Sequence, residues 1–103
     1  MAKAISLTYT TFANLADAEA LAEQAIQQSL AKCVNIIPGG VSIYPWEGKL
    51  ERSQEVYALF KSPQDQQAAL AQWLEQVHPY DVPAIIQWRG DSSDAFAQYI
   101  GAC

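Results

Sequence analysis

The feature that most constrains the fold of this chain is a long β-hairpin, predicted from Cys33 to Lys61. Both arms are rich in β-branched, aromatic and other apolar residues, which fit the pleated, half-buried surface of a strand. The segment Trp46–Lys49 is the expected reversal, because Gly48 can adopt the positive φ that a hairpin turn demands. Pro38–Gly40 interrupts the first arm, and we expect a bulge or kink there.

The length of this hairpin predicts an oligomer. Each arm is expected to hold about eleven residues, or roughly 35 Å at the rise of a strand. The flanking helices, at about fifteen residues, span only roughly 23 Å. The hairpin should therefore project beyond the helices that cover the sheet, with Tyr44, Trp46 and Leu50 in its outer part. Because a two-stranded ribbon is marginal alone and its edges invite pairing, we expect the arms to lie on neighbouring subunits.

Composition restricts the class of protein. The 103 residues fit one domain, 1–103, and with 50% hydrophobic residues a packed core is expected. The net charge of −5 and the absence of a Lys/Arg cluster argue against nucleic-acid binding. No apolar run has the length of a membrane span and the first residues resemble a strand, so we expect a cytoplasmic protein without membrane contact. The two cysteines, Cys33 and Cys103, have no metal or disulfide spacing, and Cys103 should be mobile.

The remaining elements follow from periodicity and from helix signals. Residues 4–10 alternate and predict a first strand, after which Asn14 caps a helix with apolar residues at helical spacing. Ser62 is expected to cap a second helix, with Pro63 at its first position, and the helix should end at His78 because proline follows.

A fourth strand and a last helix complete the chain. The continuous apolar run 84–88 predicts the strand, and Arg89-Gly90 should follow it as a turn. Ser92 or Ser93 is expected to cap a short terminal helix. The order β-α-β-β-α-β plus a helix predicts an α+β, ferredoxin-like fold, with helices on one face of an antiparallel sheet.

The residues in these elements resemble the divalent-cation tolerance family CutA in an order that covers nearly the whole chain. The matching motifs are Ala31–Gly39, Ser42-Ile43-Tyr44, Trp46–Lys49, Glu55, His78-Pro79-Tyr80 and Pro83, with a weaker match at 96–100. The resemblance implies a ferredoxin-like subunit similar to the signalling protein PII, and a homotrimer whose long hairpins extend sheets between subunits. It also implies a role in tolerance of divalent metals, copper above all, and no catalytic activity. Some members carry a cysteine and a second histidine where this chain has Thr10 and Val77.

His78 is the only histidine and the one candidate metal ligand that we select. Imidazole suits copper and zinc, so His78 is a candidate ligand for a divalent cation such as Cu²⁺. The alternative is a helix-end histidine whose ring satisfies terminal carbonyls. Cys33 is either a soft ligand or a small buried hydrophobe. The acids Glu47, Glu51, Glu55 and Asp81 match no calcium-loop spacing.

For the interface between subunits we select Tyr44, Trp46, Gly48, Glu55 and Tyr80. Exposed rings of this kind more often anchor an interface than line a ligand pocket. No nucleophile with a base and an orienting group is recognisable, so we expect no enzyme and no organic cofactor. The expected function is a homotrimer that responds to divalent metal cations and binds copper. The alternative is a PII-like signalling or binding trimer that holds a small ligand or a protein partner between subunits.

Overall fold

The computed structural model describes residues 3–101 of the chain. The prediction for Cys103 lies outside these residues. The elements, in chain order, are β1 (Lys3–Phe12), α1 (Leu15–Gln27), β2 (Cys33–Trp46), β3 (Lys49–Ser62), the 3₁₀ turn η1 (Gln64–Gln66), α2 (Gln67–Val77), β4 (Ile86–Ser92) and α3 (Asp94–Gly101).

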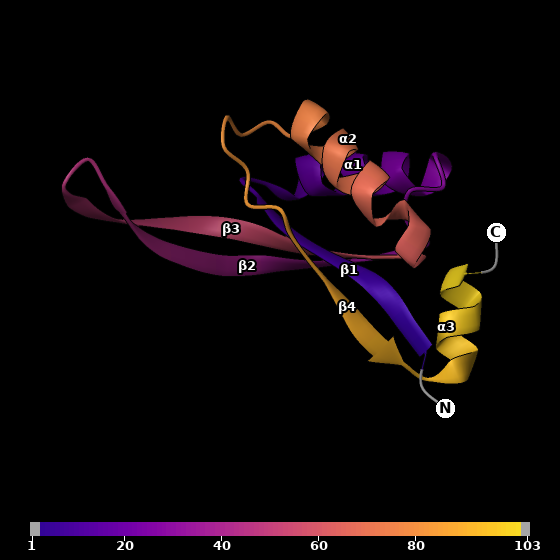
Figure 1. Ribbon diagram of the computed structural model, residues 1–103. Coiled ribbons are helices and arrows are strands. Elements are labelled where there is room, and N and C mark those ends of the chain that lie inside the picture. The colour runs from indigo at the N-terminus through magenta and orange to yellow at the C-terminus, as the bar shows by residue number, and fades with distance from the viewer. Residues whose placement is uncertain (1–2, 102–103) are drawn as a thin grey trace.

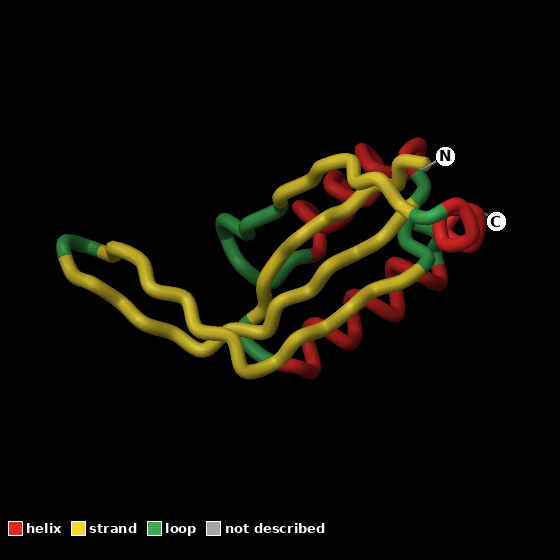
Figure 2. The backbone as a smooth tube through the Cα atoms, turned by 90° about the horizontal axis from the view of Figure 1, so that it is seen from below, coloured by secondary structure: helices red, strands yellow, loops and turns green. Residues whose placement is uncertain are grey.

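The four strands form one antiparallel sheet in the order β2-β3-β1-β4. Helices α1 and α2 lie side by side over one face of this sheet (Figures 1 and 2). The predicted ferredoxin-like α+β fold is therefore confirmed. Asn14 caps α1 as expected, because its side-chain oxygen accepts a hydrogen bond of 2.8 Å from the backbone N–H of Asp17.

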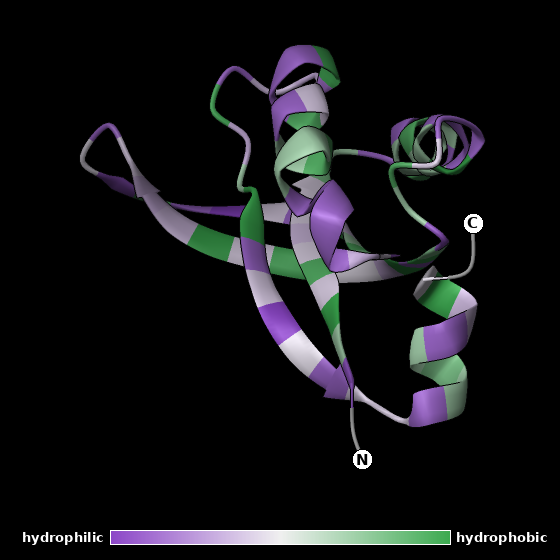
Figure 3. Cartoon of the chain, turned by 45° about the vertical axis from the view of Figure 1, so that its right-hand side comes forward, coloured by the Kyte–Doolittle hydropathy of each residue, from purple (hydrophilic) through white to green (hydrophobic). Residues whose placement is uncertain are grey.

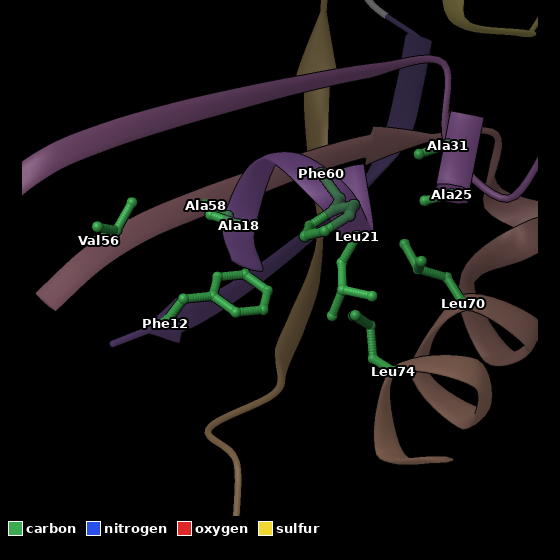
Figure 4. Packing of buried hydrophobic residues seen from close by; sticks show 10 residues of the cluster. All are labelled: Phe12, Ala18, Leu21, Ala25, Ala31, Val56, Ala58, Phe60, Leu70 and Leu74. Atoms are coloured by element: carbon green, nitrogen blue, oxygen red, sulfur yellow. The ribbon is translucent and has the colours of Figure 1, made fainter. Parts of the chain in front are cut away.

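The main core lies between the sheet and the two helices. Phe12 and Phe60 from the sheet meet Leu21 of α1 with Leu70 and Leu74 of α2 (Figure 4). Four of these five side chains have no exposed surface, and burial of each such side chain is worth roughly 1.5–3 kcal/mol. The alanines of α1 that face the sheet, Ala18 and Ala25, are also fully buried and permit close approach of the helix.

The opposite face of the sheet is only partly covered. Helix α3 packs on one corner of it, where Ala97 and Ile100 bury Ile5. Hydrophobic and hydrophilic bands alternate along the strands (Figure 3), as expected for a sheet with two different faces. Beyond α3, the side chains of Ile86 and Trp88 remain about half exposed on this open face.

The hairpin of β2 and β3 projects beyond the rest of the molecule (Figures 1 and 2). Each arm has 14 residues, more than predicted, and the molecule extends 47 Å along its longest axis. Trp46 pairs with Lys49 across the turn, where Glu47 and Gly48 both have positive φ, as a tight hairpin turn requires. The predicted bulge is confirmed, because the register shifts between Ile37 and Gly40.

Two local predictions are wrong. Ser62 does not cap α2: it is the last residue of β3, and its hydroxyl donates a 2.9 Å hydrogen bond to the carbonyl of Leu30. Arg89-Gly90 is not a turn, because β4 runs from Ile86 to Ser92 and these two residues pair with β1. Gly90 suits this position, since a Cβ there would overlap the side chain of Leu7.

Candidate functional site

One concavity of the described residues lies between the projecting hairpin and the loop that follows α2. It has a volume of about 450 Å³ and is open to solvent at its mouth. We call it the aromatic cup, and its principal lining residues are Thr11, Tyr44, Trp46, Glu55, Tyr80 and Asp81. Four of the five residues selected from the sequence for the interface thus line one concavity. Gly48 does not, because it sits in the hairpin turn with open space around it.

Strand geometry explains how the hairpin contributes to the cup. Tyr44 and Trp46 are two residues apart on β2, so their rings lie on the same face of the hairpin. The side chain of Trp46 is 61% exposed and that of Tyr44 is 39% exposed, so neither ring is buried within the subunit. The Ser53 hydroxyl donates to the Tyr44 hydroxyl at 3.3 Å across the pair of strands, which helps to position that ring.

The connection from α2 to β4 forms the other wall of the cup. It leaves α2 at His78 and returns toward the sheet on the side from which the hairpin projects (Figure 1). The hydroxyl of Tyr80 in this loop donates a 2.8 Å hydrogen bond to Glu55 of β3. This contact joins the loop to the base of the hairpin.

Glu55 is held in its ionised form. Burial alone would raise the pKa of its carboxyl group, but hydrogen bonds from Ser42, Tyr80 and Thr11 outweigh burial and place that pKa below its usual value. Burial, with the hydrogen bond to Glu55, raises the pKa of Tyr80 well above its usual value. At neutral pH the cup therefore contains a carboxylate and a neutral phenol.

His78 lies behind the cup, with its side chain only 8% exposed. The backbone N–H of Tyr80 donates to Nδ1 at 3.1 Å, so the ring proton is on Nε2, which donates to the Thr11 carbonyl at 2.9 Å. The ring also stacks on Phe12, with centroids 4.7 Å apart and planes at 6°. Burial lowers the pKa of His78, although the Thr11 carbonyl opposes this effect. A neutral imidazole thus joins the end of β1 to the loop after α2.

A copper site at His78 does not fit the single subunit. Both ring nitrogens are engaged by backbone groups, so no lone pair is free for a metal. Among residues 3–101 there is no group of three or more His, Cys, Asp or Glu side chains with the spacing to hold a metal ion. Glu47 and Glu51 lie on the hairpin outside the cup lining, and the Cys33 thiol packs at the α3 corner.

The hairpin, the cup and the sheet order can be compared with known proteins. A family model described as CutA1 divalent ion tolerance protein matches residues 6–103. The chain belongs to this family. The resemblance found in the sequence motifs is thereby confirmed.

Individual CutA proteins agree with this assignment. Over 71 residues the chain is 48% identical to divalent-cation tolerance protein CutA of Yersinia pestis and of Yersinia pseudotuberculosis, a match that spans 69% of this chain and 60% of theirs. The structure of CutA from Synechococcus elongatus superposes with a TM-score of 0.92 at 33% identity, covering 97% of this chain and 90% of that one. CutA1 of Ehrlichia chaffeensis gives a TM-score of 0.91 at 31% identity, covering 93% and 91%.

The sequence selects four residues of the cup, Tyr44, Trp46, Glu55 and Tyr80, but it does not show that they line one concavity. The sequence gives no signal for Thr11, because only the fold brings the end of β1 beside Tyr44 and Tyr80. The sequence offers Asp81 as an oxygen ligand for hard cations or as a solvated surface acid, and neither interpretation places it in a cup. The alternation of Tyr44 and Trp46 on one strand face was the available signal. No helix among the described residues of this family member is both long and apolar enough to cross a membrane.

Proposed function

We propose that the protein is a homotrimer of the CutA kind that takes part in the response to divalent cations by binding, not by catalysis. The observation that carries this proposal is the projecting hairpin. Its outer part exposes Ile43 by 58% and Leu50 by 79%, an unusual amount of apolar surface for a ribbon of two strands. Neighbouring copies would cover these side chains and pair with the bare edges of the ribbon.

The open face of the sheet supports the same assembly. Ile86 and Trp88 are half exposed there, and Ile37 at the start of the hairpin is 55% exposed. These residues form a surface that is continuous with the hairpin, since β2, β3, β1 and β4 belong to one sheet. Burial of both surfaces by sister subunits would remove the exposed apolar area from water.

The mass of the protein in solution tests the assembly. Light scattering at micromolar concentration should give about three times the 11.3 kDa of one chain. The Leu50→Glu variant should give smaller species, because a charge then replaces an apolar contact on the hairpin. Glu47→Lys, which changes a charge in the turn, is the matched control and should remain trimeric. A wild-type protein that runs as a monomer would contradict the proposal.

A binding role is favoured over catalysis by the state of His78. The only histidine of the chain has both ring nitrogens occupied by backbone partners, so it is poorly placed to accept or donate a proton in a reaction. The cytoplasm remains the proposed location on the sequence argument alone.

Copper is the cation to test first, and His78 is the ligand that the sequence nominates. Calorimetric titration of Cu²⁺ into wild type and His78→Ala compares the protein with and without this ring. Since the geometry leaves no free lone pair, we expect equal titrations. Loss of a binding event in His78→Ala would instead assign the ring as a ligand and would require it to leave the Thr11 carbonyl or the Tyr80 N–H.

A further inference from the structure

We infer that the aromatic cup binds a small organic cation whose charge is carried by a substituted ammonium group. The inference specifies a ligand for the proposed binding role and does not depend on copper. It begins with the composition of the cup, an open space of about 450 Å³ whose lining includes Tyr44, Trp46 and Tyr80 together with Glu55 and Asp81. Aromatic rings combined with carboxylates are the recognition chemistry of alkylated ammonium ions, which are attracted to ring faces and to negative charge.

The size of the cup suits a small molecule. Ligand sites in proteins usually occupy roughly 300–1,000 Å³, and this cup lies in the lower half of that range. Its walls come from the hairpin and from the loop after α2, and the Tyr80–Glu55 hydrogen bond of 2.8 Å holds the two walls together. The cup is therefore formed before any ligand arrives.

The charge in the cup selects a cation. Glu55 is ionised, and the groups that stabilise its charge are the hydroxyls of Ser42, Tyr80 and Thr11 with a weaker contribution from His78. No lysine or arginine of the described residues is among them. A carboxylate that accepts from Tyr80 keeps further lone pairs for a ligand. An anion would be repelled by Glu55 and Asp81, and the net charge of −5 adds to this repulsion.

The same residues disfavour a bare metal ion. Transition-metal and calcium sites require several nitrogen, sulfur or oxygen donors around one point. The cup offers two acidic side chains, and residues 3–101 contain no cluster of three or more metal-binding side chains. Indole and phenol faces do not replace those donors, but they do stabilise an ammonium ion whose alkyl groups reduce its hydration.

Paired probes test the inference without any mutation. Choline should bind the wild-type protein in isothermal titration calorimetry, whereas its neutral carbon isostere 3,3-dimethylbutan-1-ol should bind at least about tenfold more weakly, since it lacks the charge. Equal affinity for the two probes would overturn the inference, because it would show a merely apolar pocket. Absence of choline binding up to about 10 mM would overturn it as well, whether the cup is empty or filled by a neighbouring subunit.

Matched variants locate the site. Glu55→Gln keeps the size of the side chain and should weaken choline binding by about tenfold. Glu47→Gln removes the same charge from the hairpin turn and should leave the affinity unchanged. Trp46→Leu keeps an apolar side chain but loses the ring face, and it should weaken binding by about fivefold. Equal affinities for wild type, Glu55→Gln and Trp46→Leu would place the ligand elsewhere.

Light scattering on the same samples separates this inference from the proposed assembly. A trimer that does not bind choline refutes the cup and leaves the trimer intact. A monomer that binds choline with the expected dependence on Glu55 refutes the trimer and leaves the cup intact.

Discussion

Replacement of Thr10 by valine should stabilise the protein. Thr10 lies on β1 with its side chain fully buried against the helices, and its hydroxyl oxygen has no hydrogen-bond partner. A buried hydroxyl without a partner costs about 1–3 kcal/mol. Valine has almost the same shape, favours strands and removes the unpaired group without opening a cavity. We expect the free energy of unfolding to rise by about 1 kcal/mol, which corresponds to an increase of roughly 4–8 °C in Tm for a domain of this size.

Thr8 provides the matched control for this experiment. It lies two residues earlier on the same face of β1 and is equally buried, but its Oγ1 accepts a 2.9 Å hydrogen bond from the side-chain amide of Gln87. Thr8→Val removes that acceptor and should cost about 0.5–1.5 kcal/mol. Urea unfolding of both variants at one protein concentration measures the difference, since an oligomer's stability depends on concentration. The reasoning is refuted if both valine variants shift stability in the same direction.

Three further predictions concern His78, Gly40 and Ser62. Burial lowers the pKa of His78 below its unfolded value of 6.5, so the protein takes up a proton when it unfolds in acid. The contribution of the neutral ring to the free energy of unfolding is therefore complete above pH 6.5 and is lost as the pH falls through the folded pKa. Urea unfolding at several pH values should show stability falling over this range, and His78→Gln should make that dependence on pH weaker. Gly40→Ala should cost about 1–3 kcal/mol, because its Cβ would overlap the ring of Tyr57. Ser62→Ala should cost a similar amount, about 1–3 kcal/mol, because it leaves the Leu30 carbonyl without its donor; thermal unfolding measures both.

Two variants serve as controls for the last two predictions. Gly101→Ala places its methyl group in open space and should leave stability unchanged within about 0.5 kcal/mol. Ser92→Ala removes a partly exposed hydroxyl that donates to the neighbouring carbonyl of Ser93, and it should be equally neutral. If Gly40→Ala or Ser62→Ala unfolds at the same temperature as its control, the contact assigned to that residue carries no stability.

The sequence predicted those parts of the fold that depend on neighbours along the chain. The hairpin turn, the bulge at Pro38–Gly40 and the cap at Asn14 each follow from local φ preferences or a side chain that reaches a nearby N–H. The errors occurred where pairing with a strand that is distant in the sequence determines the local structure. Gly90 resembles a turn residue by itself, yet pairing with β1 keeps it in a strand.

The candidate site was harder to predict for the same reason. Glu55 and Tyr80 are 25 positions apart, and only the fold brings them within 2.8 Å. Their hydrogen bond changes the interpretation of both residues, since the phenol, together with Ser42 and Thr11, keeps the Glu55 carboxylate charged in the cup. The motif order indicated the family, but the arrangement of charge required coordinates.

The polar and aromatic groups around the cup form two layers, a buried one that contains His78 and a more accessible one that lines the cup. His78 stacks on Phe12, and both of its ring nitrogens form hydrogen bonds with backbone groups. The only imidazole of the chain therefore has a structural role. The more accessible layer contains the rings of Tyr44 and Trp46 and the partly buried carboxylate of Glu55. Rings and carboxylates attract cations without forming a transition-metal site. In this chain the rings and the carboxylate of the cup, and not the buried imidazole, are therefore the groups that a dissolved cation can reach.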